Sequence, residues 1–117
     1  MADAGSRDPG KLSTEVTVSI RGSLNEVAAT VMDLTATGMD VFSTGRLPPN
    51  ERVGMTIRCS AVSGPGVAVS GEVQRIRDKP SGGYFIHIEF VHSGDSERWI
   101  QSFLWSLEEV RQKKRGR

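Results

Sequence analysis

Apolar and polar residues alternate in six stretches of the chain, and this period of two predicts β-strands with one buried face. In the first stretch, residues 15–20, the side chains of Val16, Val18 and Ile20 fall on one side of an extended backbone. Five further stretches show alternation or a short apolar run, at residues 26–32, 39–42, 55–59, 67–77 and 84–91. Gly71 is a predicted weak point of the longest stretch, because a glycine inside a strand often marks a bulge.

The connections between these stretches are short and rich in turn-forming residues. Pro48 and Pro49 interrupt the pattern, because proline lacks an amide donor and fixes φ. Residues 63–66 and 78–83 contain the glycines and proline typical of turns. Short connections join antiparallel neighbours, and a small antiparallel sheet avoids exposed edges by closing on itself. The sequence therefore predicts a mostly β fold, a six-stranded antiparallel β-barrel.

Only the C-terminal part of the chain has the periodicity of a helix. Ser93 or Asp95 provides an N-cap, and Glu97 places a negative charge in the first turn. Apolar residues then recur at spacings of three and four, at Ile100, Phe103, Leu104, Leu107 and Val110. We expect this C-terminal α-helix to cover an open end of the barrel. We also expect Trp99 and Trp105 to pack in the core or beside it.

A chain of 117 residues is sufficient for one compact domain. The expected division is a flexible N-terminal arm at residues 1–13, a barrel with its helix at residues 14–110 and a basic tail at residues 111–117. The tail carries five of the 15 basic residues and no acid, which leaves ten bases against 14 acids in the rest of the chain. A general nucleic-acid binder would be expected to carry a basic face on the domain itself, so this distribution argues against DNA or RNA binding.

No apolar run approaches the roughly 20 residues of a membrane-spanning helix. The first residues lack the apolar segment of a secretory signal, and Cys59 is the only cysteine and has no partner for an internal disulfide. We therefore expect no membrane span and a cytoplasmic location, with Cys59 as a small core residue.

Residues that could support catalysis are few and form no recognisable motif. The histidines and the cysteine lack the spacings of a zinc site or a nucleophilic dyad, and no hydrolase or Walker motif is present. His87 alternates with Ile86 and Ile88, which predicts an exposed or partly exposed histidine on a strand. We expect a protein that is not an enzyme and that needs no metal or cofactor.

The stretch DLTATG, residues 33–38, lies between the second and third predicted strands. One interpretation is local: Asp33 and Thr35 bond nearby backbone amides, and Gly38 supplies a φ that other residues resist. The stretch also matches the pattern (D/N)xSxxG, with Thr35 keeping the hydroxyl of the serine. The chain resembles the PilZ domain from about residue 11 onward. The resemblance rests on this motif, on the IHIEF strand at residues 86–90 and on the closing helix. PilZ domains are a bacterial family of cyclic di-GMP receptors.

The resemblance implies that the protein binds cyclic di-GMP through two motifs. In the first, Asp33 accepts the N–H donors of guanine, Thr35 adds a hydroxyl contact and Gly38 lets backbone approach closely. The second, RxxxR before the first strand, provides arginines for the phosphates and for the N7/O6 edge of guanine. Here it is represented by Arg7 and Lys11, whose lysine meets a phosphate only as a point charge. The loss of one forked contact is expected to weaken binding about 10- to 100-fold.

The basic tail contains a literal RxxxR, formed by Arg111 and Arg115. At positions i and i+4 of a helix these side chains project from one face, so they are an alternative arginine pair for the ligand. The order of the motifs then differs from that of the family. The other interpretations are a solvated basic helix end that the helix dipole favours, or a contact for an acidic partner or a nucleic acid.

Two functions follow from the resemblance. In the first, the protein is a receptor: cyclic di-GMP orders residues 5–13 over the barrel, and the newly ordered surface acts on an unidentified protein partner. In the second, it is a PilZ-like adaptor that does not bind cyclic di-GMP and acts by protein contact, for example in type IV pilus assembly or motility. Asp33, Thr35 and Gly38 favour the receptor, whereas Lys11, Asp8 and the acidic body favour the adaptor.

Overall fold

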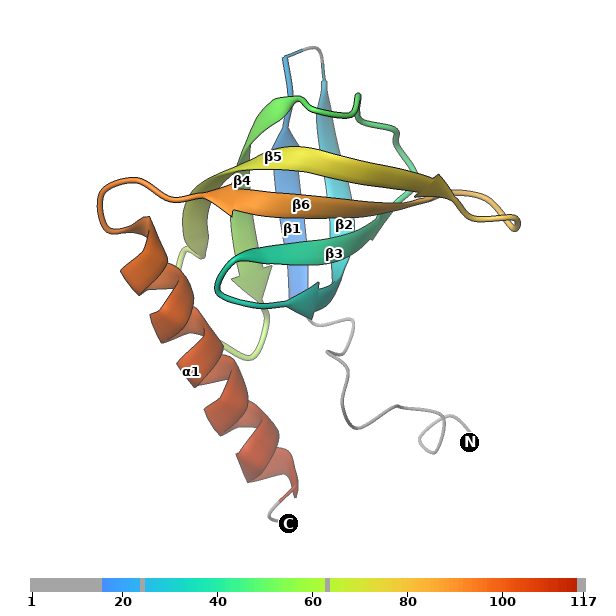
Figure 1. Ribbon diagram of the computed structural model, residues 1–117. Helices are drawn as coiled ribbons and strands as arrows, with labels where there is room; N and C mark the ends of the chain where they lie inside the picture. Colours follow the sequence, from blue (N-terminus) through green and yellow to red (C-terminus); the bar gives the residue numbers. More distant parts are fainter. Residues whose placement is uncertain (1–15, 24, 63, 116–117) are drawn as a thin grey trace.

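The computed structural model describes residues 16–23, 25–62 and 64–115, and in this part the chain forms six strands followed by one helix (Figure 1). The elements are β1 (Val16–Arg21), β2 (Glu26–Leu34), β3 (Gly38–Ser43), β4 (Arg52–Cys59), β5 (Val67–Asp78), β6 (Tyr84–Val91) and α1 (Ser96–Arg115). The strands close into an antiparallel barrel. This confirms the predicted mostly β fold with a C-terminal helix. The predicted arm, residues 1–13, lies outside the described residues, and α1 continues through residues 111–115 of the predicted tail.

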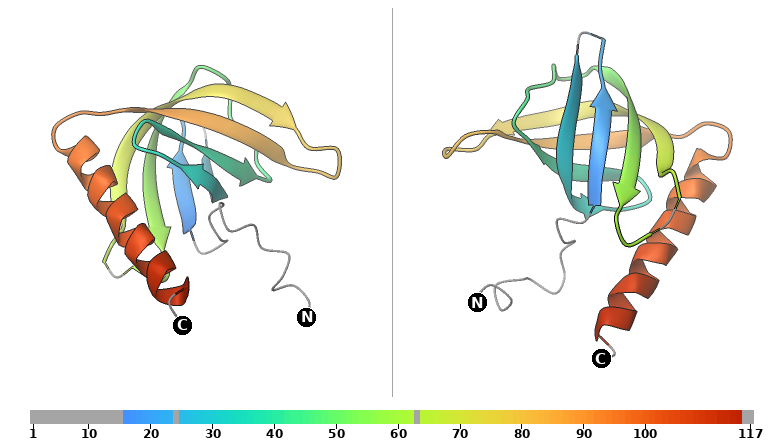
Figure 2. Two further views of the ribbon diagram at one scale, coloured as in Figure 1. Left: turned by 60° about the horizontal axis from the view of Figure 1, so that its bottom comes forward. Right: turned by 180° about the vertical axis from the view of Figure 1, so that it is seen from behind.

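The strands follow the order β1-β2-β3-β6-β5-β4 around the barrel. Consecutive strands are neighbours except β3 and β4, where residues 44–51 cross to the far side of the sheet. Two backbone hydrogen bonds join the crossing segment to β5. The amide of Asn50 donates to the carbonyl oxygen of Val73 at 2.7 Å, and the amide of Val73 donates to the carbonyl oxygen of Glu51 at 2.9 Å. As a result β3 and β6 lie side by side, at the centre of a four-stranded wall formed by β2, β3, β6 and β5 (Figure 2).

Alternate residues of each strand point into the barrel and are buried. The inward side chains are mostly aliphatic, and Ile20, Ile57 and Ile88 are fully buried. α1 adds three residues of its apolar stripe to the same buried cluster, at Ile100, Phe103 and Leu107. The helix therefore completes the barrel core. Cys59 is buried with a free thiol, as the sequence predicts.

A β-bulge in β2 decides the direction of Asp33. The pairing of β2 with β3 shifts between Val31 and Asp33, so Met32 is an extra residue opposite β3. Val31 points inward, Met32 and Asp33 are both exposed, and Leu34 is buried again. The strand therefore extends two residues beyond its predicted end, and Asp33 lies on its outer face.

A second bulge has the same effect in β5. The pairing with β6 shifts between Val73 and Arg75, with Gln74 as the extra residue. Gln74 and Arg75 are both exposed, and the inward direction resumes at Ile76. The predicted weak point at Gly71 is wrong, since Gly71 keeps regular pairing on both sides. Without the bulge, strict alternation from Val73 would turn Arg75 into the core.

The turn between β1 and β2 is held by the carboxylate of Glu51. This carboxylate accepts the hydroxyl of Ser23 at 2.6 Å and the backbone amide of Ser23 at 2.7 Å. Both bonds stabilise the charged form, the hydroxyl bond more than the amide bond, so they lower the pKa of Glu51 below its ordinary value of 4.5. The crossing segment is thus tied to two neighbouring parts of the barrel.

α1 begins directly after Asp95. The amide of Trp99 donates to the carbonyl oxygen of Asp95 at 3.0 Å, so Asp95 rather than Ser93 occupies the N-cap position. The prediction that both tryptophans pack in or beside the core is wrong for Trp105, which is 68% exposed. Trp99 is half-buried and lines a surface pocket together with the buried Cys59 and Phe103. At about 100° per residue, Trp105 falls on the face opposite the buried stripe of the helix.

Candidate functional site

Thr35 organises the turn that joins β2 to β3. Its amide donates to the carbonyl oxygen of Gly38 at 2.9 Å. Its hydroxyl oxygen accepts the amides of Thr37 and Gly38, each at 3.3 Å, and its hydroxyl proton is directed to the carbonyl oxygen of Gly38 at 3.2 Å. The local role predicted for Thr35 is therefore confirmed. That predicted for Asp33 is wrong, because no hydrogen bond joins its side chain to a described backbone amide and it points outward from β2.

Gly38 is required because two strands approach closely at this position. Its φ lies outside the left-handed region, so the prediction that it supplies an unusual φ is wrong. A Cβ atom on Gly38 would lie 2.6 Å from the carbonyl oxygen of Ile88 and 3.3 Å from the Cα atom of Glu89. Both atoms belong to the backbone of β6, which the pairing with β3 holds in place.

His92 connects the same turn to the beginning of α1. Its Nε2 atom lies 2.9 Å from the carbonyl oxygen of Ala36, and its Nδ1 atom lies 2.9 Å from the hydroxyl oxygen of Ser96. Because a carbonyl oxygen only accepts, Nε2 donates to Ala36, and in a neutral ring with this tautomer the hydroxyl of Ser96 donates to Nδ1. The oxygen of Ser96 also accepts the amide of Ser93 at 3.0 Å. A continuous hydrogen-bonded chain thus runs from the motif turn to the helix.

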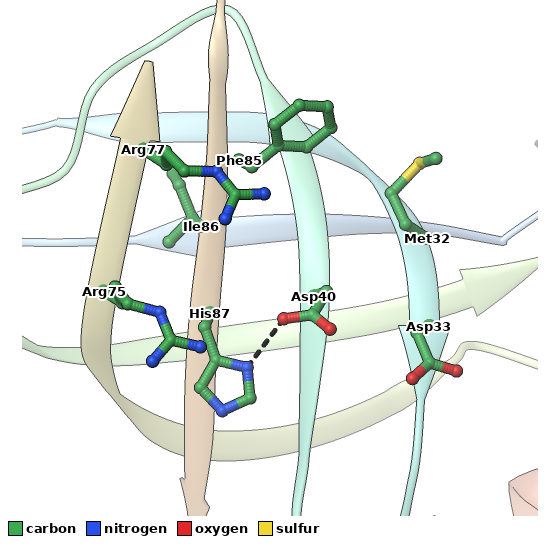
Figure 3. A pocket seen from close by; sticks show the side chains of 8 residues that line it. All are labelled: Met32, Asp33, Asp40, Arg75, Arg77, Phe85, Ile86 and His87. Atoms are coloured by element: carbon green, nitrogen blue, oxygen red, sulfur yellow. Dashed lines mark hydrogen bonds and ion pairs between the residues drawn. The ribbon is translucent and has the colours of Figure 1, made fainter. Parts of the chain in front are cut away.

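A pocket of about 520 Å³ lies on the outer face of the four-stranded wall (Figure 3). Its volume falls within the range of small-molecule sites. Residues from all four strands line it, at Met32, Asp33, Asp40, Arg75, Arg77, Phe85, Ile86 and His87. Of the predicted site residues that the structure describes, Asp33 lines this pocket, whereas Thr35 and Gly38 hold the adjoining turn.

Four polar residues form a continuous row across the pocket, one from each strand (Figure 3). In the strand register Asp33 is paired with Asp40, Asp40 with His87, and His87 with Arg75. The Nδ1 atom of His87 lies 2.6 Å from a carboxylate oxygen of Asp40, a contact that becomes an ion pair when the ring is protonated. The side chain of His87 is 33% exposed, which confirms the predicted partly exposed histidine. The row runs from acids on β2 and β3 to a base on β5.

Phe42 and Phe85 form an aromatic pair beside this row. Their ring centres lie 5.7 Å apart with an angle of 60° between the ring planes. The guanidinium of Arg77 lies 5.7 Å from the centre of the Phe85 ring, and the ammonium of Lys79 lies 4.8 Å from the centre of the Phe42 ring. Such cation–π contacts hold the cations over the rings. Positive charge therefore gathers at the β5 side of the wall.

The predicted basic motifs are not brought to this pocket in the described part of the structure. Arg7 and Lys11 lie outside the described residues. Arg111 is paired with Glu108 on α1, at 3.4 Å between nitrogen and oxygen, and the side chain of Arg115 is likewise outside the description. The residues that line the pocket come from strands, so α1 contributes none of them.

Sequence reasoning missed Asp40, Arg75, Arg77 and Phe85 as pocket residues and assigned no binding role to His87. The change of phase in β5 was one available signal, because inward positions 69, 71 and 73 are followed by 76 rather than 75. That signal would have placed both arginines outside the barrel. The approach of β5 to β2 across β3 and β6 follows from the strand order, which short-range periodicity does not contain.

The part of the chain that the structure describes contains neither a cluster of metal-binding side chains nor a helix that could span a membrane. Across residues 16–23, 25–62 and 64–115, no group of three or more His, Cys, Asp or Glu side chains is arranged to hold a metal ion. The helix in these residues is not apolar enough over a sufficient length to cross a membrane.

Comparison with known families agrees with this geometry, since the model of the PilZ domain matches residues 6–104. The chain belongs to the PilZ domain family. The match includes the motif at residues 33–38, the four strands that carry the pocket, and both Arg7 and Lys11. PilZ domains form a family of receptors and adaptors of the cyclic di-GMP type.

The fold of this PilZ domain is similar to that of a solved structure, the Bacillus subtilis inhibitor of motility MotI/DgrA. The TM-score is 0.61 at 17% sequence identity, and the alignment covers 92% of this chain and 52% of that chain. This chain therefore spans about half the length of that structure, and at such low identity the likeness concerns the fold alone. No curated protein sequence matches this chain.

Proposed function

We propose that this PilZ domain is a receptor that binds cyclic di-GMP at the pocket beside Asp33 and relays the binding to a protein partner. The observation that carries the proposal is the position of Asp33. The acid of the family motif is exposed, lines a pocket of ligand size, and stands in a row that ends in a base at Arg75. A guanine nucleotide needs this combination of an acceptor for the base and donors for the phosphates.

The contacts expected of each group follow from its chemistry. Asp33 accepts the N1–H and N2–H donors of guanine, while the turn held by Thr35 fixes the end of β2. Arg7 and Lys11 bind phosphate when the ligand orders residues 5–13 over the barrel. The proposed activity is binding without catalysis. A receptor for an intracellular messenger acts where the messenger is made, so a cytoplasmic location belongs to the same proposal.

The relay to a partner is proposed to run through α1. The motif turn is bonded to His92, and His92 is bonded to Ser96 in the first turn of the helix. A ligand that alters the turn therefore acts on the beginning of α1 through two hydrogen bonds. The exposed Trp99 and Trp105 each supply an apolar contact on the same helix for a protein partner.

The test is isothermal titration of the protein with cyclic di-GMP, comparing the wild type with Asp33→Ala. The substitution removes the acceptor for guanine, so we expect binding to be lost or weakened at least 100-fold. Asp33→Asn keeps one acceptor oxygen and should retain part of the affinity. Glu109→Ala, which removes an exposed acid from α1, is the control and should bind as the wild type does. Equal affinity of the wild type and Asp33→Ala would refute the assignment.

The second candidate function is that of an adaptor without a ligand, in motility or type IV pilus assembly. The large exposure of Trp99 and Trp105 favours it, since aromatic residues are enriched at protein interfaces. Lys11, which stands where the family has a second arginine, also favours it. A folded wild type that gives no heat with cyclic di-GMP at low or moderate salt would support this function over the first.

A further inference from the structure

Two arginines on β5 are positioned for an anion that the family motifs do not assign to them. The bulge at Gln74 turns Arg75 outward, and Arg77 follows on the same face after the inward Ile76. Both arginine side chains are exposed and line the pocket that Asp33 also lines. Among the described residues, no hydrogen bond or ion pair engages either guanidinium, so their donors are available to a ligand.

The surroundings of the two arginines hold them at the pocket without neutralising them. The ring of Phe85 lies 5.7 Å from the guanidinium of Arg77, and this contact orients the guanidinium while leaving its N–H donors open. Arg75 is the strand partner of His87. The acid nearest to it along the row, Asp40, is bonded to His87 instead. β5 also carries the acids Glu72 and Asp78, but among the described residues neither of them forms an ion pair with Arg75 or Arg77.

The separation of acids and bases matches the two ends of a nucleotide. Asp33 on β2 and Arg75 on β5 are three strand spacings apart, which is about 14 Å along the sheet. Side chains reaching inward from both sides leave room for a base, a sugar and a phosphate between them. Guanine offers N–H donors to a carboxylate, and a phosphate accepts forked bonds from a guanidinium. We therefore expect the ligand to lie along the row, with guanine at the Asp33 end and a phosphate at the Arg75 end.

We propose that Arg75 and Arg77 form a phosphate-binding pair that completes the nucleotide site opened by Asp33. The inference rests on the proposed function, because it assigns the phosphate end of the same ligand. It also accounts for how a domain with Lys11 in place of an arginine retains two guanidinium groups for an anionic ligand. The pair comes from the barrel itself, so it is in place before the ligand binds.

The experiment is isothermal titration with cyclic di-GMP of the wild type, of Arg75→Gln/Arg77→Gln, and of the control Arg21→Gln/Arg98→Gln. The control also removes two positive charges, but from exposed residues of β1 and α1 that do not line the pocket. We expect the β5 pair to weaken binding at least tenfold for each arginine, and the control to bind within twofold of the wild type. The single variants Arg75→Gln and Arg77→Gln should each show part of the loss.

The outcomes separate this inference from the function on which it rests. If the wild type binds and Asp33→Ala does not, but Arg75→Gln/Arg77→Gln binds within twofold of the wild type, the phosphate pair is refuted and the receptor stands. If the wild type does not bind cyclic di-GMP, both are refuted. A loss confined to the β5 pair, with unchanged thermal unfolding of all variants, supports the inference. Because both side chains are exposed, the substitutions should leave the fold intact.

Discussion

Gly38→Ala tests whether the glycine of the motif is there for the barrel rather than for the ligand. An added Cβ atom would lie 2.6 Å from the carbonyl oxygen of Ile88, closer than a real Cβ contact allows. The obstructing atom is backbone, in a strand that is paired on both sides, so relief requires β3 and β6 to move apart. Gly54→Ala is the control, because Gly54 is also a strand glycine but is exposed, and its Cβ atom would meet nothing within 4 Å.

The expected magnitude follows from these two environments. Inserting a methyl group where packing is tight costs about 1 to 3 kcal/mol, while the reduced freedom of the unfolded chain returns about 0.4 to 1 kcal/mol for a glycine to alanine change. The free energy of unfolding should therefore fall by about 1 to 2 kcal/mol for Gly38→Ala. For Gly54→Ala it should stay constant or rise by up to about 1 kcal/mol. For a domain of this size the first change lowers the melting temperature by roughly 4 to 8 °C.

Urea denaturation followed by circular dichroism measures both changes, and the slope of the transition reports whether unfolding stays two-state. Titration with cyclic di-GMP of the folded Gly38→Ala protein then shows whether the displaced strands weaken the site as well. If Gly38→Ala is as stable as Gly54→Ala, the close approach of β6 is not the reason for the glycine and the packing argument fails.

Two further predictions concern hydrogen bonds that connect separate parts of the barrel. His92→Phe keeps a ring but removes the bonds to Ala36 and Ser96, so urea denaturation should show a loss of about 1 to 2 kcal/mol; an unchanged midpoint would contradict the proposed link between the motif turn and α1. Glu51→Gln tests the bonds to Ser23, which lower the pKa of this carboxyl from 4.5 in the folded state. A lowered acid pKa stabilises the fold fully above the unfolded value, and this contribution disappears as the pH falls through the folded value. The stability difference between the wild type and Glu51→Gln should thus be present at pH 7 and decrease below about pH 4.5, as measured by thermal unfolding across this range; a difference independent of pH would exclude the charge of Glu51 as its cause.

The strands were predictable because each one carries its own signal. In β1 and β4 alternation is uninterrupted, and the inward residues are those that the period of two assigns. The helix was predictable from the spacing of Ile100, Phe103 and Leu107. Trp105 was placed wrongly, since a bulky apolar residue was expected to pack in the core or beside it although Trp105 lies off the stripe. Periodicity decides the face of a helix more reliably than the size of a single side chain.

The candidate site likewise has one part that the sequence predicted and one part that it did not. The motif at residues 33–38 is continuous in sequence, so Asp33, Thr35 and Gly38 could be selected without a structure. Their individual roles could not be predicted from the sequence. Thr35 stabilises the turn, Gly38 allows the close approach of β6, and Asp33 lines the pocket. Each task depends on which segment lies opposite.

The sequence by itself determined the six strands, the helix and the motif, because these depend on neighbours a few residues apart. Only the tertiary structure decided that Asp33, Asp40, His87 and Arg75 share one row, since they come from four strands joined by antiparallel pairing. Two bulges, at Met32 and Gln74, complete that arrangement by turning Asp33 and Arg75 outward. The physical reason is that barrel closure and strand order bring residues far apart in sequence into register. Local periodicity fixes only the face of each strand.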